Sequence, residues 1–335
     1  MVQGPRAAPR STGKTRPTGD SMDSSRLQGR LLPLVVVLLI LAGSAASLAL
    51  LQHHQGAARS LPDWSGYDPE LAGMISRIDE SELYRTARDL QDFTTRVHPS
   101  AGNEAAAEYL HARLDAIPGL EVGYQGGELR NVVGVLPGQD PDSGQVVVVG
   151  AHYDSASSDP ARAPGATDNA GGVAIVMELA RVMNAHRFNH SVAFAFWNAE
   201  ETGQQGSRAY VEEASAGSPE IALYFNYDSA CYDPEGRFVL DLVYNNESRE
   251  FADQMEDDNS LYGIGFNLTR NVHGCGSDHR PFWEAGYPAV TTHAETHAPT
   301  VHSPGDTADL VSTEYARRNA QLGLLVIARA AGMQR

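Results

Sequence analysis

The positions of apolar residues alternate, from Asp68 to the C-terminus, between helical spacing and short runs typical of strands. Helical spacing predicts helices at residues 68–96, 103–117, 171–185, 205–213, 248–258 and 313–331. Strands are predicted at residues 120–124, 131–136, 145–150, 191–197, 221–227, 238–243 and 289–292. The run VVVV at 146–149 is typical of a strand buried on both faces. This alternation predicts one α/β domain over residues 68–335, with a mixed, mainly parallel central sheet flanked by helices.

The first part of the chain has a different pattern. Residues 1–30 are basic and rich in Pro, Gly, Ser and Thr, and we expect them to be disordered. Residues 31–51 are uncharged and mostly apolar, which is long enough for a membrane-spanning helix. Basic residues precede this segment, which places the N-terminus in the cytoplasm and, after a linker at 52–67, the α/β domain outside the cell membrane. The alternative is a signal peptide cleaved among the small residues 42–47, which would give a secreted protein.

The composition excludes some classes of partner. The net charge of −17 argues against nucleic-acid binding, because a phosphate-binding face needs clustered Lys and Arg. A hydrophobic fraction of 42% fits one large globular domain. The two cysteines, Cys231 and Cys275, fit an exported protein. Either a disulfide between them or two free thiols agrees with the sequence, because a bridge requires spatial proximity.

Five candidate metal ligands stand beside apolar runs. They are, in chain order, His152, Asp168, Glu201, Asp228 and His302, in the motifs AHYDS, GATDNAGG, NAEETGQQGS, FNYDSA and VHSPGDT. Three of them follow predicted strands, and the carboxyl ends of parallel strands meet at one edge of a sheet. Two histidines and three carboxylates can hold two divalent cations if one carboxylate bridges them, and zinc accepts these N and O donors.

Each candidate also has an ordinary structural explanation. Asp168 precedes a predicted helix, where an N-cap is the usual role of Asp. His293 and His297 compete with His302 for the place of the last ligand. A His-x-Asp pair and a Glu–Glu pair are common on surfaces. The joint occurrence of all five in this order and topology is what favours a metal site.

Two further carboxylates are predicted to assist the ligands. Asp154 is placed to accept a proton from His152 and so to decide which ring nitrogen faces a metal. Adjacent side chains at the end of a strand point apart. Glu200 and Glu201 are therefore predicted to supply one base and one ligand.

The motifs HYDS, PGATDNAGG, AEETGQQGS, NYDS, SDHRPF, AGYPA and VHSPGDT together resemble the co-catalytic two-zinc exopeptidases. This family includes bacterial leucyl aminopeptidases, aminopeptidase Y and glutamate carboxypeptidase. The resemblance implies two Zn²⁺ ions bridged by Asp168, with His152 and Asp228 completing one metal's shell and Glu201 and His302 the other's. It also implies Glu200 as general acid/base, Asp154 and Asp306 as supporting residues, and a cis peptide bond after Asp168.

The activity that the resemblance implies is release of N-terminal residues from peptides. A hydroxide that bridges the metals would attack the peptide carbonyl, and Glu200 would carry the proton. Secreted bacterial relatives often have a tyrosine that stabilises the oxyanion in the loop before SDH. Here that loop reads HGCG, so His273 and His279 are the candidate substitutes.

Other readings of the sequence remain open. Glutaminyl cyclases share the fold and some of the motifs, but they use one zinc ion and do not hydrolyse peptides. A catalytically silent binding ectodomain of the same fold typically loses ligands, whereas this chain keeps all of them. A carboxypeptidase needs an arginine clamp for the substrate carboxylate. Near the motifs the sequence has no clustered pair, only Arg162, Arg208, Arg270 and Arg280. The sequence therefore favours an aminopeptidase.

Overall fold

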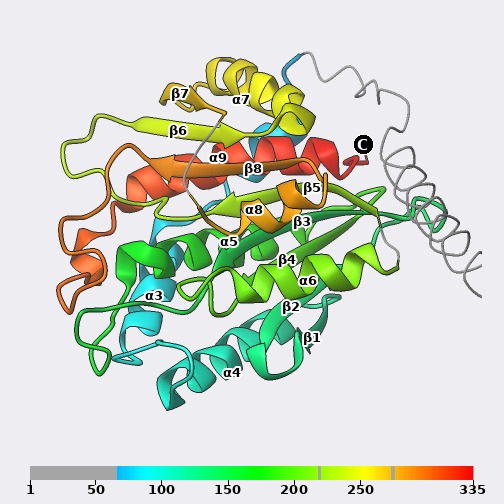
Figure 1. Cartoon of the computed structure of the whole chain (residues 1–335). Coiled ribbons are helices and arrows are strands. Elements are labelled where there is room, and N and C mark those ends of the chain that lie inside the picture. Colours follow the sequence, from blue (N-terminus) through cyan, green and yellow to red (C-terminus); the bar gives the residue numbers. More distant parts are fainter. Residues whose placement is uncertain (1–65, 218–219, 273–275, 335) are drawn as a thin grey trace, which may run out of the picture. The chain divides into compact units, whose positions relative to one another are not determined.

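A computed structural model describes residues 66–217, 220–272 and 276–334 (Figure 1). The predicted basic arm, the membrane segment and the linker up to residue 65 lie outside these residues. Within the part of the chain that is described, no helix has the length and apolar character needed to cross a bilayer.

Within the described residues, eight strands form one mixed sheet in the order β1-β2-β4-β3-β5-β8-β6-β7. The strands are β1 (Glu121–Gln125), β2 (Asn131–Leu136), β3 (Gln145–His152), β4 (Ser191–Trp197), β5 (Glu220–Tyr227), β6 (Val239–Tyr244), β7 (Asn267–Asn271) and β8 (Ala289–Ala294). The four central strands β4, β3, β5 and β8 run parallel to one another. The antiparallel pairs lie toward the sides, between β1 and β2, β2 and β4, and β6 and β8. The predicted mixed, mainly parallel sheet is confirmed.

Helices cover both faces of this sheet (Figure 1). They are α2 (Pro69–Ile75), α3 (Glu80–Gln91), α4 (Ala101–Asp115), α5 (Gly171–Met183), α6 (Gln205–Ser215), α7 (Arg249–Leu261), α8 (His279–Glu284) and α9 (Thr313–Ala330). Helices α3, α5 and α9 pack on one another, with α5 and α9 against β3 and β5. Helices α6 and α8 pack together, and α8 also contacts β5 and β8. Because helices lie on both faces, every residue of β3 from Val146 onward is buried, as the VVVV run predicted.

The structure corrects several element boundaries. The helix predicted over 68–96 is two helices, because Asp79 leaves helical geometry and its carboxylate caps α3 by accepting from the amide of Ser81. Strand β3 extends to His152, two residues beyond its predicted end. Strand β7 was missed because NLTRN is a mostly exposed edge strand without apolar alternation. Helix α8 was missed because it has only six residues.

Candidate metal centre

The five predicted ligands converge at the carboxyl edge of the parallel strands. His152 is the last residue of β3, and Asp228 directly follows β5. Glu201 lies four residues after the end of β4. Asp168 comes from the segment between β3 and α5, and His302 from the segment between β8 and α9. The fold thus brings together residues that are far apart in the chain, such as His152 and His302, which are separated by 150 positions (302 − 152).

The first donor group consists of His152, Asp168 and Asp228, whose ligand atoms lie within 4.8 Å of one another. Nε2 of His152 is 3.2 Å from Oδ1 of Asp168 and 3.5 Å from Oδ1 of Asp228. The imidazole is only 1% exposed. This group therefore forms the inner part of the site.

The second donor group consists of Asp168, Glu201 and His302. Nε2 of His302 is 3.2 Å from Oδ2 of Asp168 and 3.1 Å from Oε2 of Glu201. Asp168 thus directs a different carboxylate oxygen to each group, as the predicted bridging role requires. His302 is 51% exposed, so the second group faces solvent.

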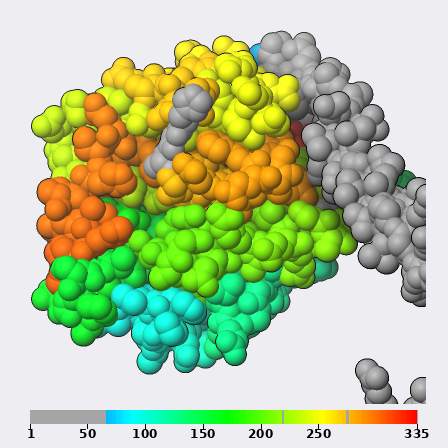
Figure 2. Space-filling model, viewed as in Figure 1, coloured from blue at the N-terminus to red at the C-terminus, as the bar shows by residue number. Residues whose placement is uncertain are grey.

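Two loops meet beside this outer group. The backbone amide of Ser158 donates to the carbonyl of His302 at 2.9 Å. Figures 1 and 2 show the orange segment before α9 lying against the green segment between β3 and α5 at the left side of the view. His302 itself has a left-handed backbone with φ of 55°, a conformation that is uncommon outside glycine. The neighbouring loop therefore helps to hold an unfavourable backbone that points its imidazole at Asp168.

Asp306 holds the segment that carries Asp168. Its carboxylate accepts hydrogen bonds from the amide of Thr167 at 3.0 Å, from the Thr167 hydroxyl at 2.6 Å and from the amide of Asp168 at 3.2 Å. The peptide bond between Asp168 and Asn169 is cis, as the resemblance implied. Asp306 is 1% exposed, so its supporting contacts are shielded from water.

Asp154 links the first group to the two glutamates. Its Oδ1 is 3.4 Å from Nδ1 of His152, which leaves Nε2 of that ring directed at the other carboxylates. The same carboxylate accepts from the amides of Glu200 at 3.1 Å and Glu201 at 3.2 Å. Asp154 therefore orients one ligand and fixes the turn that carries another.

The crowding of carboxylates and imidazoles shifts their proton affinities. Burial lowers the pKa of His152, but hydrogen bonds to Asp154, Asp168 and Asp228 outweigh it and raise that pKa well above its ordinary value. Hydrogen bonds to Asp168 and Glu201 raise the pKa of His302 to about 10. Burial would raise the pKa of Asp168, yet the two histidines hold it well below its usual range. The raised pKa values of both histidines show that negatively charged carboxylates dominate the surroundings of each ring. Such surroundings favour a bound cation.

Glu200 has a different environment from Glu201. Neither donor group includes Glu200, which is 8% exposed. Burial raises its pKa to about 9, and Oε1 accepts a hydrogen bond from Nε2 of Gln204 at 2.9 Å. Glu201 contributes Oε2 to the outer group. The two adjacent carboxylates thus have different surroundings, and their division into one base and one ligand stays a prediction.

The donor set fits two zinc ions. Each group offers one imidazole nitrogen and two carboxylates, which is a set that zinc accepts. Oε1 of Glu201 is buried without a hydrogen-bond partner among the described residues. Unpaired buried carboxylates are costly, and a cation would satisfy them.

Other predicted residues do not join the site in the same way. His279 begins α8, is fully buried and lies edge-on to Trp283 with ring centroids 4.4 Å apart, which argues against direct contact with a substrate oxyanion. His273 lies outside the described residues. His293 is buried in β8, and neither it nor His297 belongs to the two donor groups. His302 is thus the histidine that the geometry selects.

The predicted alternative of a disulfide is not borne out at Cys231, which is a free and buried thiol. Its Sγ lies so close to Gly171 that a side chain at that position would collide with it. Cys231 therefore fills space beside the start of α5. Cys275 lies outside the described residues.

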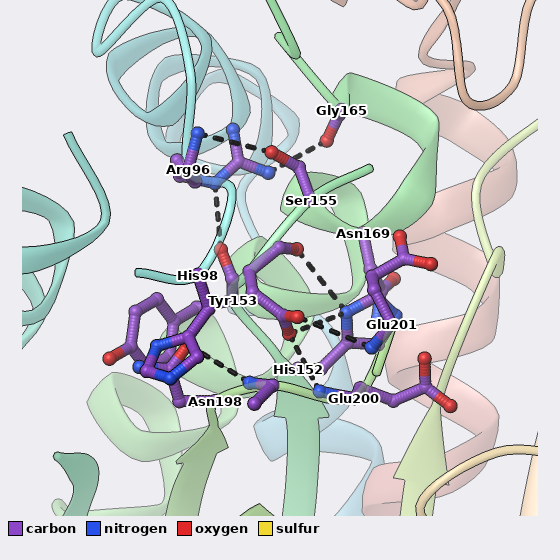
Figure 3. A network of polar contacts seen from close by, with 12 residues as sticks. Arg96, His98, His152, Tyr153, Ser155, Gly165, Asn169, Asn198, Glu200 and Glu201 are labelled. Carbon is purple, nitrogen blue, oxygen red and sulfur yellow. Dashed lines mark hydrogen bonds and ion pairs between the residues drawn. The ribbon is translucent and has the colours of Figure 1, made fainter. Parts of the chain in front are cut away.

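Sequence reasoning missed a set of buried polar residues behind the ligands. The amides of Asn103 and Asn198 exchange two hydrogen bonds of 2.9 Å, and Nδ2 of Asn198 also donates to the carbonyl of Leu129. Arg96 is fully buried, and its guanidinium donates to backbone carbonyls, among them those of Tyr153 and Gly165 (Figure 3). No local pattern distinguishes these residues from surface Asn and Arg, so only the three-dimensional contacts identify them.

Comparison with known proteins places the chain in a family. Residues 131–327 match the model of Peptidase family M28. The chain belongs to this family. A probable leucine aminopeptidase of Trichophyton verrucosum is 25% identical over 289 residues, covering 80% of this chain and 77% of the relative. The family match confirms the resemblance that the motifs indicated.

Solved structures share the fold of this M28 member. The LapA aminopeptidase of Legionella pneumophila superposes with a TM-score of 0.73 at 20% identity, over 84% of this chain and 79% of LapA. A glutaminyl cyclase of Bacteroides thetaiotaomicron, solved with N-acetylhistamine, gives a TM-score of 0.60 at 20% identity over 75% of this chain and 98% of its own. The fold is therefore common to peptidases and cyclases, and the site must distinguish them.

Proposed function

We propose that this chain is a zinc-dependent aminopeptidase that releases N-terminal residues from peptides. The observation that carries the proposal is the position of Asp168, whose two oxygens serve two separate donor groups. A site with this shared carboxylate suits a pair of metals rather than a single ion. Membership of Peptidase family M28 and the similarity to a probable leucine aminopeptidase support the same reading.

The residues divide the work of peptide hydrolysis. His152 and Asp228 would hold one zinc, Glu201 and His302 the other, and Asp168 both. Two bound zinc ions would polarise the substrate carbonyl and lower the pKa of a bound water molecule. Glu200 is buried beside these groups but belongs to neither of them, which suits a carboxylate that takes up a proton and returns it to the leaving amine. The carboxylate of Asp154 holds Glu200 in place by accepting a hydrogen bond from the backbone amide of Glu200.

The charge distribution favours a substrate bound by its amino terminus. The outer donor group is acidic and faces solvent at His302, which suits a cationic or metal-binding amine. A substrate carboxylate would need a free arginine. Arg96 lies beside the site, but it is fully buried and its guanidinium is bonded to four backbone carbonyls. It is not available to a substrate.

The test uses the purified full chain with zinc and three forms of one peptide: free at both ends, N-acetylated and C-amidated. The free and amidated forms are expected to lose their N-terminal residue, and the acetylated form is expected to resist. Cleavage of the acetylated form from its C-terminus would overturn the proposal in favour of a carboxypeptidase. Cyclisation of an N-terminal glutamine without cleavage would instead indicate a cyclase, and no turnover with two bound zinc ions would indicate a silent binding domain.

We also propose that residues 31–51 anchor the protein in the cell membrane with residues 52–335 outside. The alternative, a secreted protein, would follow if this segment were a cleaved signal peptide. The uncharged apolar run after a basic arm supports this arrangement. Protease added to intact cells should digest the catalytic domain, and N-terminal sequencing should recover residues 1–30 on the mature chain. A soluble chain that begins near residue 47 would show that the segment is a cleaved signal.

A further inference from the structure

Arg96 is a buried cation that the proposed reaction does not use. It lies between α3 and α4, and none of its surface is exposed. Its guanidinium donates four hydrogen bonds, from Nε to the carbonyl of Tyr153 at 2.8 Å, from Nη1 to those of Leu90 at 3.1 Å and Pro164 at 2.6 Å, and from Nη2 to that of Gly165 at 2.9 Å. Burying a charge on neutral acceptors is costly, which calls for a reason.

Three of the four acceptors belong to segments that carry proposed metal ligands, and the fourth, Leu90, lies in α3. Tyr153 separates His152 from Asp154, so the bond to its carbonyl acts on the backbone between a ligand and the carboxylate that orients it. Pro164 and Gly165 lie four and three residues before Asp168. Asp306 holds the same segment at Asp168, through the backbone amide of that residue. One planar guanidinium therefore joins the end of β3 to the segment that presents the bridging carboxylate (Figure 3).

The backbone of Arg96 reinforces the same connection. Its amide donates to Oγ of Ser155 at 3.1 Å, and its carbonyl accepts from the amide of Ser155 at 3.3 Å. Oγ of Ser155 in turn donates to the carbonyl of Ala163 at 2.8 Å. Ser155 thus links the strand end to the Asp168 segment in parallel with the guanidinium.

Packing at Gly165 shows how closely these parts fit. A β-carbon there would lie 2.6 Å from Cβ of Ser155 and 3.0 Å from Nη2 of Arg96, and Gly165 has a positive φ of 52°. A glycine is required for the carbonyl to reach the guanidinium. The lack of a side chain at Gly165 and its positive φ therefore both allow its contact with Arg96.

The environment also keeps Arg96 charged. Burial lowers its pKa to about 10, while the carboxylates of Asp306, Asp154 and Asp168 counteract that effect. The guanidinium remains protonated near neutral pH and can donate all four hydrogen bonds.

We propose that Arg96 is a positioning residue for the two-metal site, which it serves by fixing the backbone on both sides of the gap between His152 and Asp168. The inference rests on the proposed function, because it assumes that these ligands bind zinc. Supports of this kind behind a ligand typically affect metal affinity by about 10–100-fold.

The test variant is Arg96→Lys in the full chain, because lysine keeps the positive charge and loses the fork of donors. A change in zinc affinity then reports geometry and not the loss of a nearby cation. Ser155→Ala is a milder variant of the same connection. The matched control is Arg329→Lys, since the side chain of Arg329 is only 8% exposed but pairs with Asp258 at 3.0 Å between α9 and α7.

Zinc stoichiometry and dissociation constants are measured by competition with a chelator, well below the Tm of each variant. Arg96→Lys should weaken zinc binding by about 10–100-fold and Ser155→Ala by a smaller factor. Arg329→Lys should lower Tm and leave zinc binding unchanged. A merely structural role for Arg96 would change only Tm.

Wild-type zinc affinity in both Arg96→Lys and Ser155→Ala would overturn the inference, even if both lose stability. If Arg96→Lys does not fold, Ser155→Ala alone decides. A wild-type chain that binds fewer than two zinc ions would overturn the proposed function itself, so the two failures are distinguishable.

Discussion

Nδ1 of His152 lies 3.4 Å from Oδ1 of Asp154, and each of these side chains is only 1% exposed. The buried carboxylate therefore sets the orientation of the buried ring. Because Asp154 also accepts from the amides of Glu200 and Glu201, one carboxylate connects the end of β3 to the turn after β4. This connection leads to the first prediction.

Asp154→Asn keeps the size of the side chain and removes its charge. An amide pairs less strongly with the imidazole and offers one oxygen where the carboxylate offers two, so the ring and the glutamate turn should both loosen. We expect zinc to bind about 10–100-fold more weakly at the His152 group. Titration with a chelator measures this, with the exposed Asp142→Asn as control. Equal zinc affinity in both variants would contradict the assignment.

The adjacent glutamates should respond differently to the same substitution. Glu200→Gln removes the proton acceptor outside the donor groups, so kcat should fall by about 10²–10⁴-fold with both zinc ions retained. Glu201→Gln removes an oxygen from the outer group, so one zinc should be lost first. Elemental analysis and peptide kinetics on both variants separate the effects. The roles are wrong if both variants lose metal and neither shows a selective loss of rate.

Much of the fold and the convergence of the candidate ligands could be predicted because their signals are local. A parallel strand buried on both faces requires a continuous apolar run, and the residue after such a run lies at the sheet edge where loops meet. His152 and Asp228 were found in this way. The choice of His302 over His293 depended on the motif resemblance, and it stays a proposal that the donor groups support, because they include His302 and not His293.

The supporting contacts could not be predicted because they join residues that are distant in sequence. Arg96 contacts Pro164 and Gly165, which lie 68 and 69 positions away, and none of these contacts leaves a periodic pattern. The surroundings of His279 could not be predicted for a related reason. A histidine beside a candidate site can turn either toward the substrate or into the core, and packing against Trp283 decides that here.

A glycine in α9 gives a prediction about stability. A β-carbon at Gly323 would collide with the hydroxyl of Tyr227, at the end of β5 just before Asp228. Gly323→Ala should therefore lower the free energy of unfolding by about 1–3 kcal/mol. The control is Gly73→Ala in α2, where nothing lies within 4 Å of the new β-carbon and the helix should gain about 0.5–1 kcal/mol. Denaturant unfolding measures both changes.

The same collision can be tested by removing its other partner. The hydroxyl of Tyr227 has no hydrogen-bond partner among the described residues, so Tyr227→Phe should cost little by itself. In the Tyr227→Phe background the cost of Gly323→Ala should shrink, because the nearest atom is gone. It should not vanish, since the ring carbon Cζ would still lie 2.9 Å from the new β-carbon. Strictly additive effects would show that the two residues do not collide.

The chelated protein should lose stability as pH rises from about 7 to 10. His302 has its pKa raised to about 10 by Asp168 and Glu201, and Glu200 has its pKa raised to about 9 by burial. Both groups bind a proton more tightly in the folded state than in the unfolded state. Their contributions to the free energy of unfolding are therefore complete below the pKa values of the unfolded state. These contributions are lost as pH rises through the pKa values of the folded state. Burial lowers the pKa of His293, whose contribution has the opposite sign but lies below this window.

Tm measured in excess chelator between pH 7 and 10 tests this expectation. Zinc should flatten the profile, because bound metal replaces the protons on the histidines. His302→Gln should also give a shallower slope in chelator, since it removes one of the groups whose pKa is raised within this window. A Tm that rises between pH 7 and 9 in the chelated wild type would mean that these groups do not hold their protons in the folded state.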